Sequence, residues 1–171
     1  MKLDLGCGAS KHPGYLGVDI AELPGVDIVA DLFSFPWPFE SESVEEILAS
    51  HFVEHVPDLI KFMNEAYRIT KPGGQVKIIV PYYTSIRCWQ DPTHVRAISQ
   101  DSFLYFNKKW REANKLTHYP ITADFDFEIT YLLEKSWREK AKDPESRAEI
   151  EYAIKHYWNV VDDMLAVLTR R

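Results

Sequence analysis

The chain has 171 residues, of which 46% are hydrophobic and 13% are aromatic, so it can bury a sizeable core and does not resemble a disordered chain. Its formal net charge of −6 argues against a large nucleic-acid interface, which usually appears as a basic face. The length and the lack of repeats or low-complexity linkers predict a single domain over residues 1–171.

The cysteines and the hydropathy pattern bear on the redox state of the thiols and on the cellular location. Cys7 and Cys88 lie far apart in the sequence and form no Cys-x-x-Cys motif, which predicts reduced thiols and a cytoplasmic location. No signal peptide precedes the first expected strand, and no run of about 20 apolar residues could span a bilayer. We therefore expect no membrane partner.

The N-terminus predicts a strand that runs into a glycine turn. Leu3 and Leu5 form the buried side of a strand over residues 2–5, and Gly6-Cys7-Gly8 follows directly. Glycine permits unusual backbone angles and lets a ligand approach the main chain closely. A strand that enters a Gly-x-Gly turn is typical of the nucleotide-sized cleft at the carboxyl edge of open α/β sheets.

A second strand is expected over residues 15–20 and carries Asp19, eleven residues after Gly8. An acid at this place can hydrogen-bond both hydroxyls of a ribose, so the glycine turn and Asp19 together indicate a nucleoside cofactor site. The connection over residues 6–14 is too short for the helical crossover that parallel strands normally need.

A third, short strand is expected over residues 26–30, near the edge of the sheet. The connection before it is also short, so two helices that would cover one face of the sheet are missing. We nevertheless expect core positions at Val18, Ile20, Ile28 and Val29. Buried parallel strands need cover on both faces. Either later helices fold back over this face, or another subunit covers it. The second alternative predicts a homo-oligomer.

The middle of the chain predicts a strand, a helix and a central strand. The strand spans residues 44–50 and ends in Ser50-His51, and the fifth strand spans residues 75–81. Between them a helix begins near Pro57 and stops at Pro72-Gly73-Gly74. Its inward face has helical spacing and consists of Leu59, Phe62, Met63, Ala66 and Ile69.

The C-terminal half is less regular. Residues 82–122 show little periodicity apart from a helix start at residues 99–102, and the sixth and seventh strands are expected over residues 124–133 and 160–169. Asp143-Pro144 opens a helix whose inward residues are Ile150, Ala153, Ile154 and Tyr157. A local basic cluster is expected to be a solvated face and consists of Lys108, Lys109, Arg111 and Lys115.

Three stretches in order carry a family resemblance: the pattern LxLGCGxxxxPGxxxVDI over residues 3–20, then residues 50–56, then residues 68–74. Together they resemble small bacterial, archaeal and phage members of the class I S-adenosylmethionine (SAM)-dependent methyltransferases. The resemblance implies an α/β, Rossmann-like, mostly parallel seven-stranded sheet with an antiparallel last strand, in a compact variant with shortened early helices. It also implies SAM as the cofactor.

The resemblance implies roles for particular residues. In the family, the acid at the position of Asp31 accepts a hydrogen bond from the adenine amino group. The aromatic loop over residues 33–39 is then either one wall of the adenine pocket or a rigid surface turn. The expected cofactor-binding residues are Asp4, Gly6, Cys7, Gly8, Asp19, Ile20, Asp31, Leu32, Ser50 and His51. Among these, Asp4 is expected behind the turn and Cys7 as a small packing residue.

Methyl transfer from a sulfonium depends mainly on holding the acceptor in line with the methyl group. A base matters only when the accepting oxygen or nitrogen carries a proton. The expected catalytic residues are His51 and His94, and Arg96 beside His94 is a candidate acceptor contact. His55 is a weaker candidate base; it and Glu54 belong to the family signature and are expected to brace a loop. The spacing of Asp91, His94 and His51 does not indicate a metal site, so no metal is expected.

The expected acceptor is a small molecule or a sugar, and two other functions are weighed against methyl transfer. A nicotinamide-dependent oxidoreductase would have a third glycine where Lys11 stands and a later acid, so the sequence disfavours it. A SAM-binding subunit or regulator without catalytic activity remains open, because the early helices are missing and no acceptor motif is evident.

Overall fold

The computed structural model describes residues 1–171. The fold is a seven-stranded sheet in the order β3-β2-β1-β4-β5-β7-β6. The strands are β1 (Lys2–Leu5), β2 (Leu16–Asp19), β3 (Ile28–Val29), β4 (Val44–Ser50), β5 (Thr70–Pro81), β6 (Phe125–Leu133) and β7 (Val161–Arg170). The neighbouring strands β3, β2, β1, β4 and β5 run parallel to one another. β7 lies between β5 and β6 and is antiparallel to both. The predicted α/β, Rossmann-like sheet with an antiparallel last strand is confirmed.

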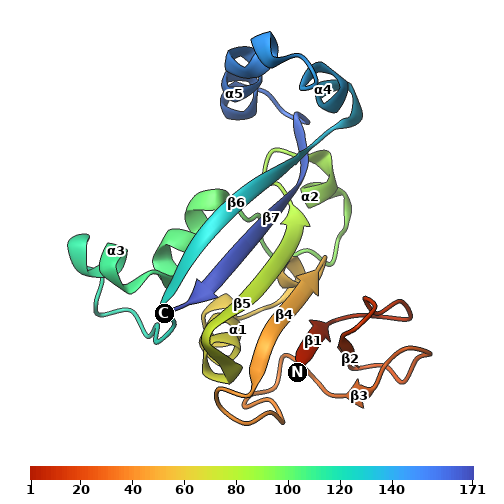
Figure 1. Ribbon diagram of the computed structural model, residues 1–171, viewed down its shortest axis with the longest axis vertical. Helices are drawn as coiled ribbons and strands as arrows, with labels where there is room; N and C mark the ends of the chain where they lie inside the picture. The colour runs from red at the N-terminus through yellow and green to blue at the C-terminus, as the bar shows by residue number, and fades with distance from the viewer.

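Most helices lie behind the sheet or beyond one end of it, and α3 lies outside the β6 edge (Figure 1). α1 and the segment carrying α2 lie behind the strands in this view, whereas α4 and α5 extend past the upper ends of β6 and β7. The α-helices are α1 (Leu59–Ile69), α2 (Ile86–Gln90), α3 (Lys108–Ala113), α4 (Lys135–Lys140) and α5 (Arg147–His156). The 3-10 helices are η1 (Val53–His55), η2 (Gln100–Phe106) and η3 (Pro144–Ser146). No helix is long and apolar enough to cross a membrane.

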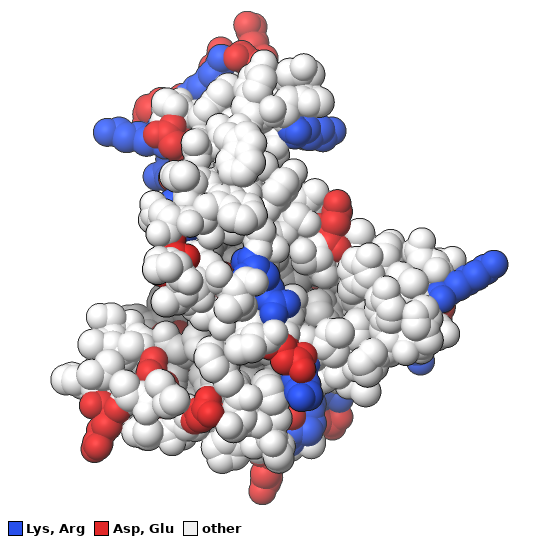
Figure 2. Space-filling view, turned by 180° about the vertical axis from the view of Figure 1, so that it is seen from behind, with Lys and Arg blue, Asp and Glu red and all other residues white.

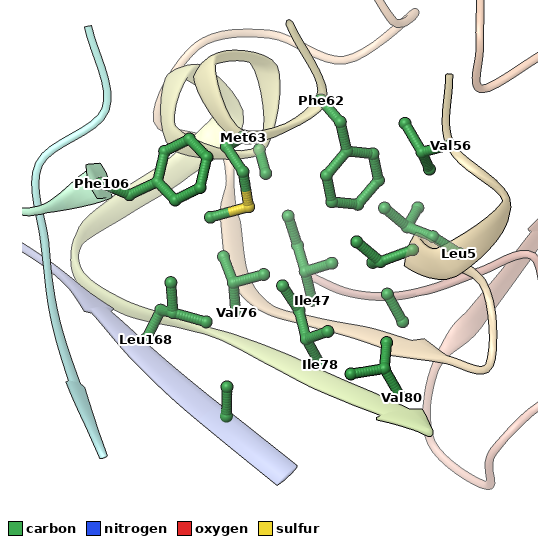
Figure 3. Close-up of a cluster of buried hydrophobic side chains, with 14 of the residues drawn as sticks. Leu5, Ile47, Val56, Phe62, Met63, Val76, Ile78, Val80, Phe106 and Leu168 are labelled. Atoms are coloured by element: carbon green, nitrogen blue, oxygen red, sulfur yellow. The ribbon is translucent and has the colours of Figure 1, made fainter. Parts of the chain in front are cut away.

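The core forms between α1 and the covered face of the sheet. Phe62 and Met63 of α1 point toward Ile47, Val76 and Ile78 on the strands below them (Figure 3), and all five side chains are fully buried. The predicted inward face of this helix is therefore confirmed. The helix begins at Leu59 instead of near Pro57, because the Asp58 side chain accepts a hydrogen bond from the Lys61 amide at 3.0 Å and acts as the N-cap.

The predicted end of α1 is wrong. The helix ends at Ile69, and Thr70 already pairs with Val44 in the sheet. The register between β4 and β5 then shifts before Gln75 pairs with Glu46, so Pro72-Gly73-Gly74 forms an irregular part of β5. Gly73 has a φ of 76°, which suits glycine at such an irregularity.

One face of the sheet is bare of helices. No helix separates β1 from β2 or β2 from β3, which confirms the shortened early helices, and none lies in front of β4 to β7 (Figure 1). Leu48, Ile79 and Leu165 on this face are half-buried. The core prediction is wrong for Ile20 and Val29, which are 68% and 57% exposed, because Ile20 lies past the end of β2 and Val29 lies on a two-residue edge strand.

The opposite side of the molecule is mostly uncharged, with charged side chains at its edges and a run of them from the middle of the face downward (Figure 2). Ile150 and Ala153 of α5 are buried as predicted, and Ile154 is half-buried. The prediction for Tyr157 is wrong: it follows α5 in an extended conformation and is 53% exposed. The helix start near residue 99 is confirmed, because Ser99 precedes η2 as its N-cap.

The basic cluster is only partly a solvated face. Lys108, Lys109 and Lys115 are exposed as expected, but Arg111 is buried. Its guanidinium donates hydrogen bonds to the carbonyls of Tyr105, Ile121 and Ala123 at 2.7 to 3.2 Å. Arg111 therefore joins the segment around α3 to the chain entering β6.

We expect Arg111→Met to lower the free energy of unfolding by about 3 kcal/mol, because buried carbonyls lose a charged donor. Lys109→Met on the same helix is the control and should change stability by less than about 0.5 kcal/mol, since Lys109 is exposed. Urea unfolding of both variants and the wild type measures the difference. Equal stability of the two variants would show that the three carbonyl contacts contribute nothing.

Candidate functional site

The glycine turn after β1 has no room for a side chain at Gly6. Gly6 and Gly8 have φ values of 69° and 53°, and the Gly6 amide donates to the Val18 carbonyl at 2.8 Å. A Cβ atom on Gly6 would lie 2.2 Å from Cδ2 of Phe52. The chain therefore passes directly against the Phe52 ring, in a backbone conformation that favours glycine.

Asp19 ties the glycine turn to the end of β2. Its Oδ2 accepts a hydrogen bond from the Gly8 amide at 2.9 Å, and its Oδ1 accepts one from the Ala21 amide at 3.0 Å. A carboxylate oxygen has two lone-pair sites, so each oxygen of Asp19 can accept one further hydrogen bond. Asp19 can thus fix the turn and still bind a hydroxyl-bearing ligand.

A shallow cavity of about 60 Å³ opens beside this turn. It brings together five of the residues expected to bind cofactor, and two phenylalanines complete the lining: Gly6, Asp19, Ile20, Asp31, Leu32, Phe33 and Phe52. The Phe33 and Phe52 rings stack with their centroids 5.8 Å apart. Apolar walls with a few convergent polar groups are typical of small-molecule sites. Phe33 belongs to the aromatic loop proposed as a wall, whereas Phe52 was not predicted.

Asp31 lies at the start of the aromatic loop and shapes it. Its Oδ1 accepts from the Phe33 amide at 2.9 Å, and its Oδ2 accepts from the Ser34 hydroxyl at 2.6 Å. The hydrogen bond from Ser34, followed by that from Phe33, holds the pKa of Asp31 below its ordinary value. An ionised acid at this cavity can accept a hydrogen bond from a ligand amino group.

Five residues expected to bind cofactor do not line this cavity, namely Asp4, Cys7, Gly8, Ser50 and His51. Asp4 and Ser50 line a separate cavity of about 350 Å³ on the bare face of the sheet, where Asp4 accepts a hydrogen bond from the His12 amide at 2.7 Å. The Cys7 sulfur packs against Gly17, where an added Cβ would lie 2.7 Å from it. Burial raises the pKa of the Cys7 thiol, which suits a packing residue and not a nucleophile.

Three histidines gather in a third, mostly polar cavity at the ends of β4 and β5. It measures about 190 Å³ and is lined by His51, Glu54, His55, Pro81, Arg87, Gln90, Asp91 and His94. Both histidines expected to be catalytic therefore lie in one place. Arg96 does not join them, because its guanidinium donates to the carbonyls of Val56 and Pro57 at 2.9 and 2.6 Å.

His51 follows β4 directly and has a φ of 52°, which is unusual for a residue other than glycine. Its Nδ1 lies 3.5 Å from Oε1 of Glu54, and its Nε2 lies 3.9 Å from Oδ2 of Asp163. The Glu54 carboxylate raises the pKa of His51 above its ordinary value, although burial opposes this. Phe52 lies between His51 and Glu54 in the sequence, so the two cavities open beside the same strand end.

Comparison with protein families matches residues 3–78 to the family described as "Methyltransferase domain". The matched segment contains the glycine turn, Asp19, Asp31 and the histidines that follow β4. No curated protein is similar enough in sequence to match the chain.

Solved structures match nearly the whole chain. A SAM-dependent methyltransferase from Archaeoglobus fulgidus has a TM-score of 0.66 and 18% identity, over 99% of this chain and 85% of that one. An S-adenosylmethionine-dependent methyltransferase from Mesorhizobium loti has a TM-score of 0.54 and 17% identity, over 99% and 90%. Geranyl diphosphate C-methyltransferase from Streptomyces coelicolor, solved with Mg²⁺ and S-adenosyl-L-homocysteine, has a TM-score of 0.59 and 16% identity, over 99% and 69%.

The fold of the whole chain is thus that of the SAM-dependent methyltransferases, and the family match places their domain signature on residues 3–78. Residues 3–78 are therefore similar to a methyltransferase domain, and the solved structures, at 16–18% identity, show the shared fold.

Proposed function

We propose that the chain is a class I SAM-dependent methyltransferase, and that SAM, its cofactor, binds over the glycine turn within a single domain of residues 1–171, with the small cavity beside the turn taking part of the nucleoside. The convergence of residues around Asp19 carries this proposal. Asp19 would accept hydrogen bonds from the ribose hydroxyls, and Asp31 would accept one from the adenine amino group. Ile20, Leu32 and Phe33 would pack on the faces of the adenine, and the glycine turn would leave space for the methionine portion. SAM supplies the methyl group on a positively charged sulfonium, whose sulfur would leave as a neutral thioether when the S–CH₃ bond breaks, so no acid is needed to assist departure.

We propose that a small-molecule or sugar acceptor enters the polar cavity lined by His51. This cavity adjoins the proposed SAM cavity at the end of β4, and its walls offer both hydrogen-bond donors and acceptors. The side chain of His51 is 40% exposed, whereas that of His94 is only 9% exposed, which favours His51 for taking a proton from the acceptor and releasing it to solvent. The chain would thus orient the acceptor and hold its proton at His51.

The test is release of S-adenosylhomocysteine (SAH) from SAM in the presence of hydroxyl- and amine-bearing small molecules and sugars. With an accepted substrate we expect His51→Ala to lower kcat about 100-fold or more, because a general base typically contributes 10²–10⁴-fold. Its SAH affinity should stay within about twofold of the wild type. His118→Ala, at an exposed histidine outside both cavities, is the matched control. An unchanged kcat for His51→Ala would remove His51 from the reaction.

A second role, as a SAM-binding subunit or regulator, is favoured only by the bare face of the sheet around Leu48, Ile79 and Leu165. A second copy of the chain packed there would form the expected homo-oligomer, which sedimentation measurements would detect. The shaped cavity around His51 and the ordered elements α2, η2 and α3 between β5 and β6 support the catalytic role.

A further inference from the structure

A cluster of three potential metal-binding side chains lies inside the polar cavity. Glu54 and His55 come from η1, and His94 comes from the turn after α2. One ligand atom from each lies within 4.8 Å of the other two. The Val95 amide donates to the Glu54 carbonyl at 3.0 Å, which holds the turn against η1 and brings the side chains together.

The Glu54 carboxylate is buried without a hydrogen-bond partner. Glu54 is 2% exposed, and neither of its oxygens accepts a hydrogen bond. The nearest polar neighbours are Nδ1 of His51 at 3.5 Å and Nε2 of His94 at 4.0 Å from Oε1. Burying an ionised carboxylate without such a partner is strongly unfavourable, so buried charges are normally paired or coordinate metals.

His94 and His55 are each held through one ring nitrogen, which leaves the other nitrogen free to bind a metal ion. Nδ1 of His94 lies 2.8 Å from the Cys88 carbonyl, which can only accept, so Nδ1 carries the hydrogen and Nε2 keeps its lone pair. Nδ1 of His55 lies 3.0 Å from the Thr93 hydroxyl, which itself donates to Asp91 at 2.6 Å and therefore accepts from His55. A histidine that ligates a metal normally donates its other ring N–H in this way.

We propose that Glu54, His55 and His94 form a binding site for a divalent transition-metal ion. Two imidazoles and a carboxylate suit Zn²⁺ and its neighbours better than Ca²⁺ or Mg²⁺, which prefer oxygen ligands alone. Oδ2 of Asp91, 3.8 Å from Nε2 of His94, lies within reach of a fourth position. Ligands of a tetrahedral Zn²⁺ lie about 3.3 Å apart, so small side-chain rotations suffice. The sequence spacing did not indicate this set of ligands. The proposal assigns His94 to metal binding in place of the proton transfer expected from the sequence.

The test is calorimetric titration of the tag-free chain with ZnCl₂. We expect one Zn²⁺ per chain, bound at least 100-fold more weakly by Glu54→Gln and by His94→Asn. Thr93→Val should weaken binding about 10-fold, because it removes the hydroxyl that orients His55. His118→Asn, at an exposed histidine, is the matched control and should bind as the wild type does.

Circular dichroism and thermal unfolding show whether each variant is folded. The visible absorption of Co²⁺ bound to the wild type reports the coordination geometry of the ion without any substitution. A wild type that binds neither ion stoichiometrically, or folded Glu54→Gln and His94→Asn variants with unchanged affinity, would overturn the metal site. The residues of the proposed metal site do not line the SAM cavity. Separate titration with SAH therefore distinguishes failure of the metal site from failure of the proposed function.

Discussion

Gly6→Ala is expected to abolish measurable SAM binding and to lower the free energy of unfolding by about 3 kcal/mol. The left-handed backbone at Gly6 disfavours any Cβ by about 1–2 kcal/mol. The added methyl group would also lie 2.2 Å from Phe52 Cδ2, and overpacking of this kind typically costs about 1–3 kcal/mol. Phe52 and the turn would have to separate, and both line the proposed SAM cavity. Urea unfolding and equilibrium dialysis with labelled SAM measure the two effects.

Gly14→Ala is the matched control for this prediction. Gly14 has a φ of 85°, but nothing lies within 4 Å of an added Cβ, and Gly14 does not line the SAM cavity. It should lose only the 1–2 kcal/mol of backbone strain and retain SAM binding. Equal effects of the two substitutions would mean that the contact between Gly6 and Phe52 is unimportant.

Asp19→Ala is expected to weaken SAM and SAH binding about 100- to 1000-fold, or about 3–4 kcal/mol at 1.4 kcal/mol per tenfold. Two contributions add to this loss. The ribose would lose its charged acceptor, and the Gly8 amide would lose the carboxylate that holds the glycine turn at 2.9 Å. Equilibrium dialysis with labelled SAM gives the dissociation constants, and thermal unfolding reports whether the variant is folded.

Asp19→Asn separates the two contributions. Its remaining side-chain oxygen can still accept from the Gly8 amide, but the charge and one acceptor are lost. We expect an affinity between that of the wild type and that of Asp19→Ala. A folded Asp19→Ala variant that binds SAM as tightly as the wild type would remove Asp19 from the cofactor site.

The parts of the fold that depend on local sequence were predicted well. β1, the glycine turn and Asp19 lie within twenty residues of one another, and hydrophobic runs mark β4 and β5. The predictions for Ile20, Val29 and Tyr157 were wrong because Ile20 and Tyr157 lie just past the ends of β2 and α5, and Val29 lies on a two-residue edge strand. Helical spacing alone does not reveal that a face stays bare.

The candidate site was predictable to the extent that neighbouring residues define it. Asp19 ends β2 and Asp31 follows β3 at the same edge of the sheet, so their convergence follows from parallel topology. The contact between Glu54 and His94 was not foreseeable, because it depends on a turn in the irregular segment 82–122 that the Val95 amide holds against η1. Arg111 was misjudged for the same reason, since its carbonyl partners lie in two other segments.

The most direct test of the account is calorimetric titration of the folded wild-type chain with SAH. The account predicts one site per chain with micromolar affinity, and competition by SAM for that same site. Absence of binding by a chain that circular dichroism shows to be folded would contradict the proposal that Gly6, Asp19 and Asp31 form the cofactor site.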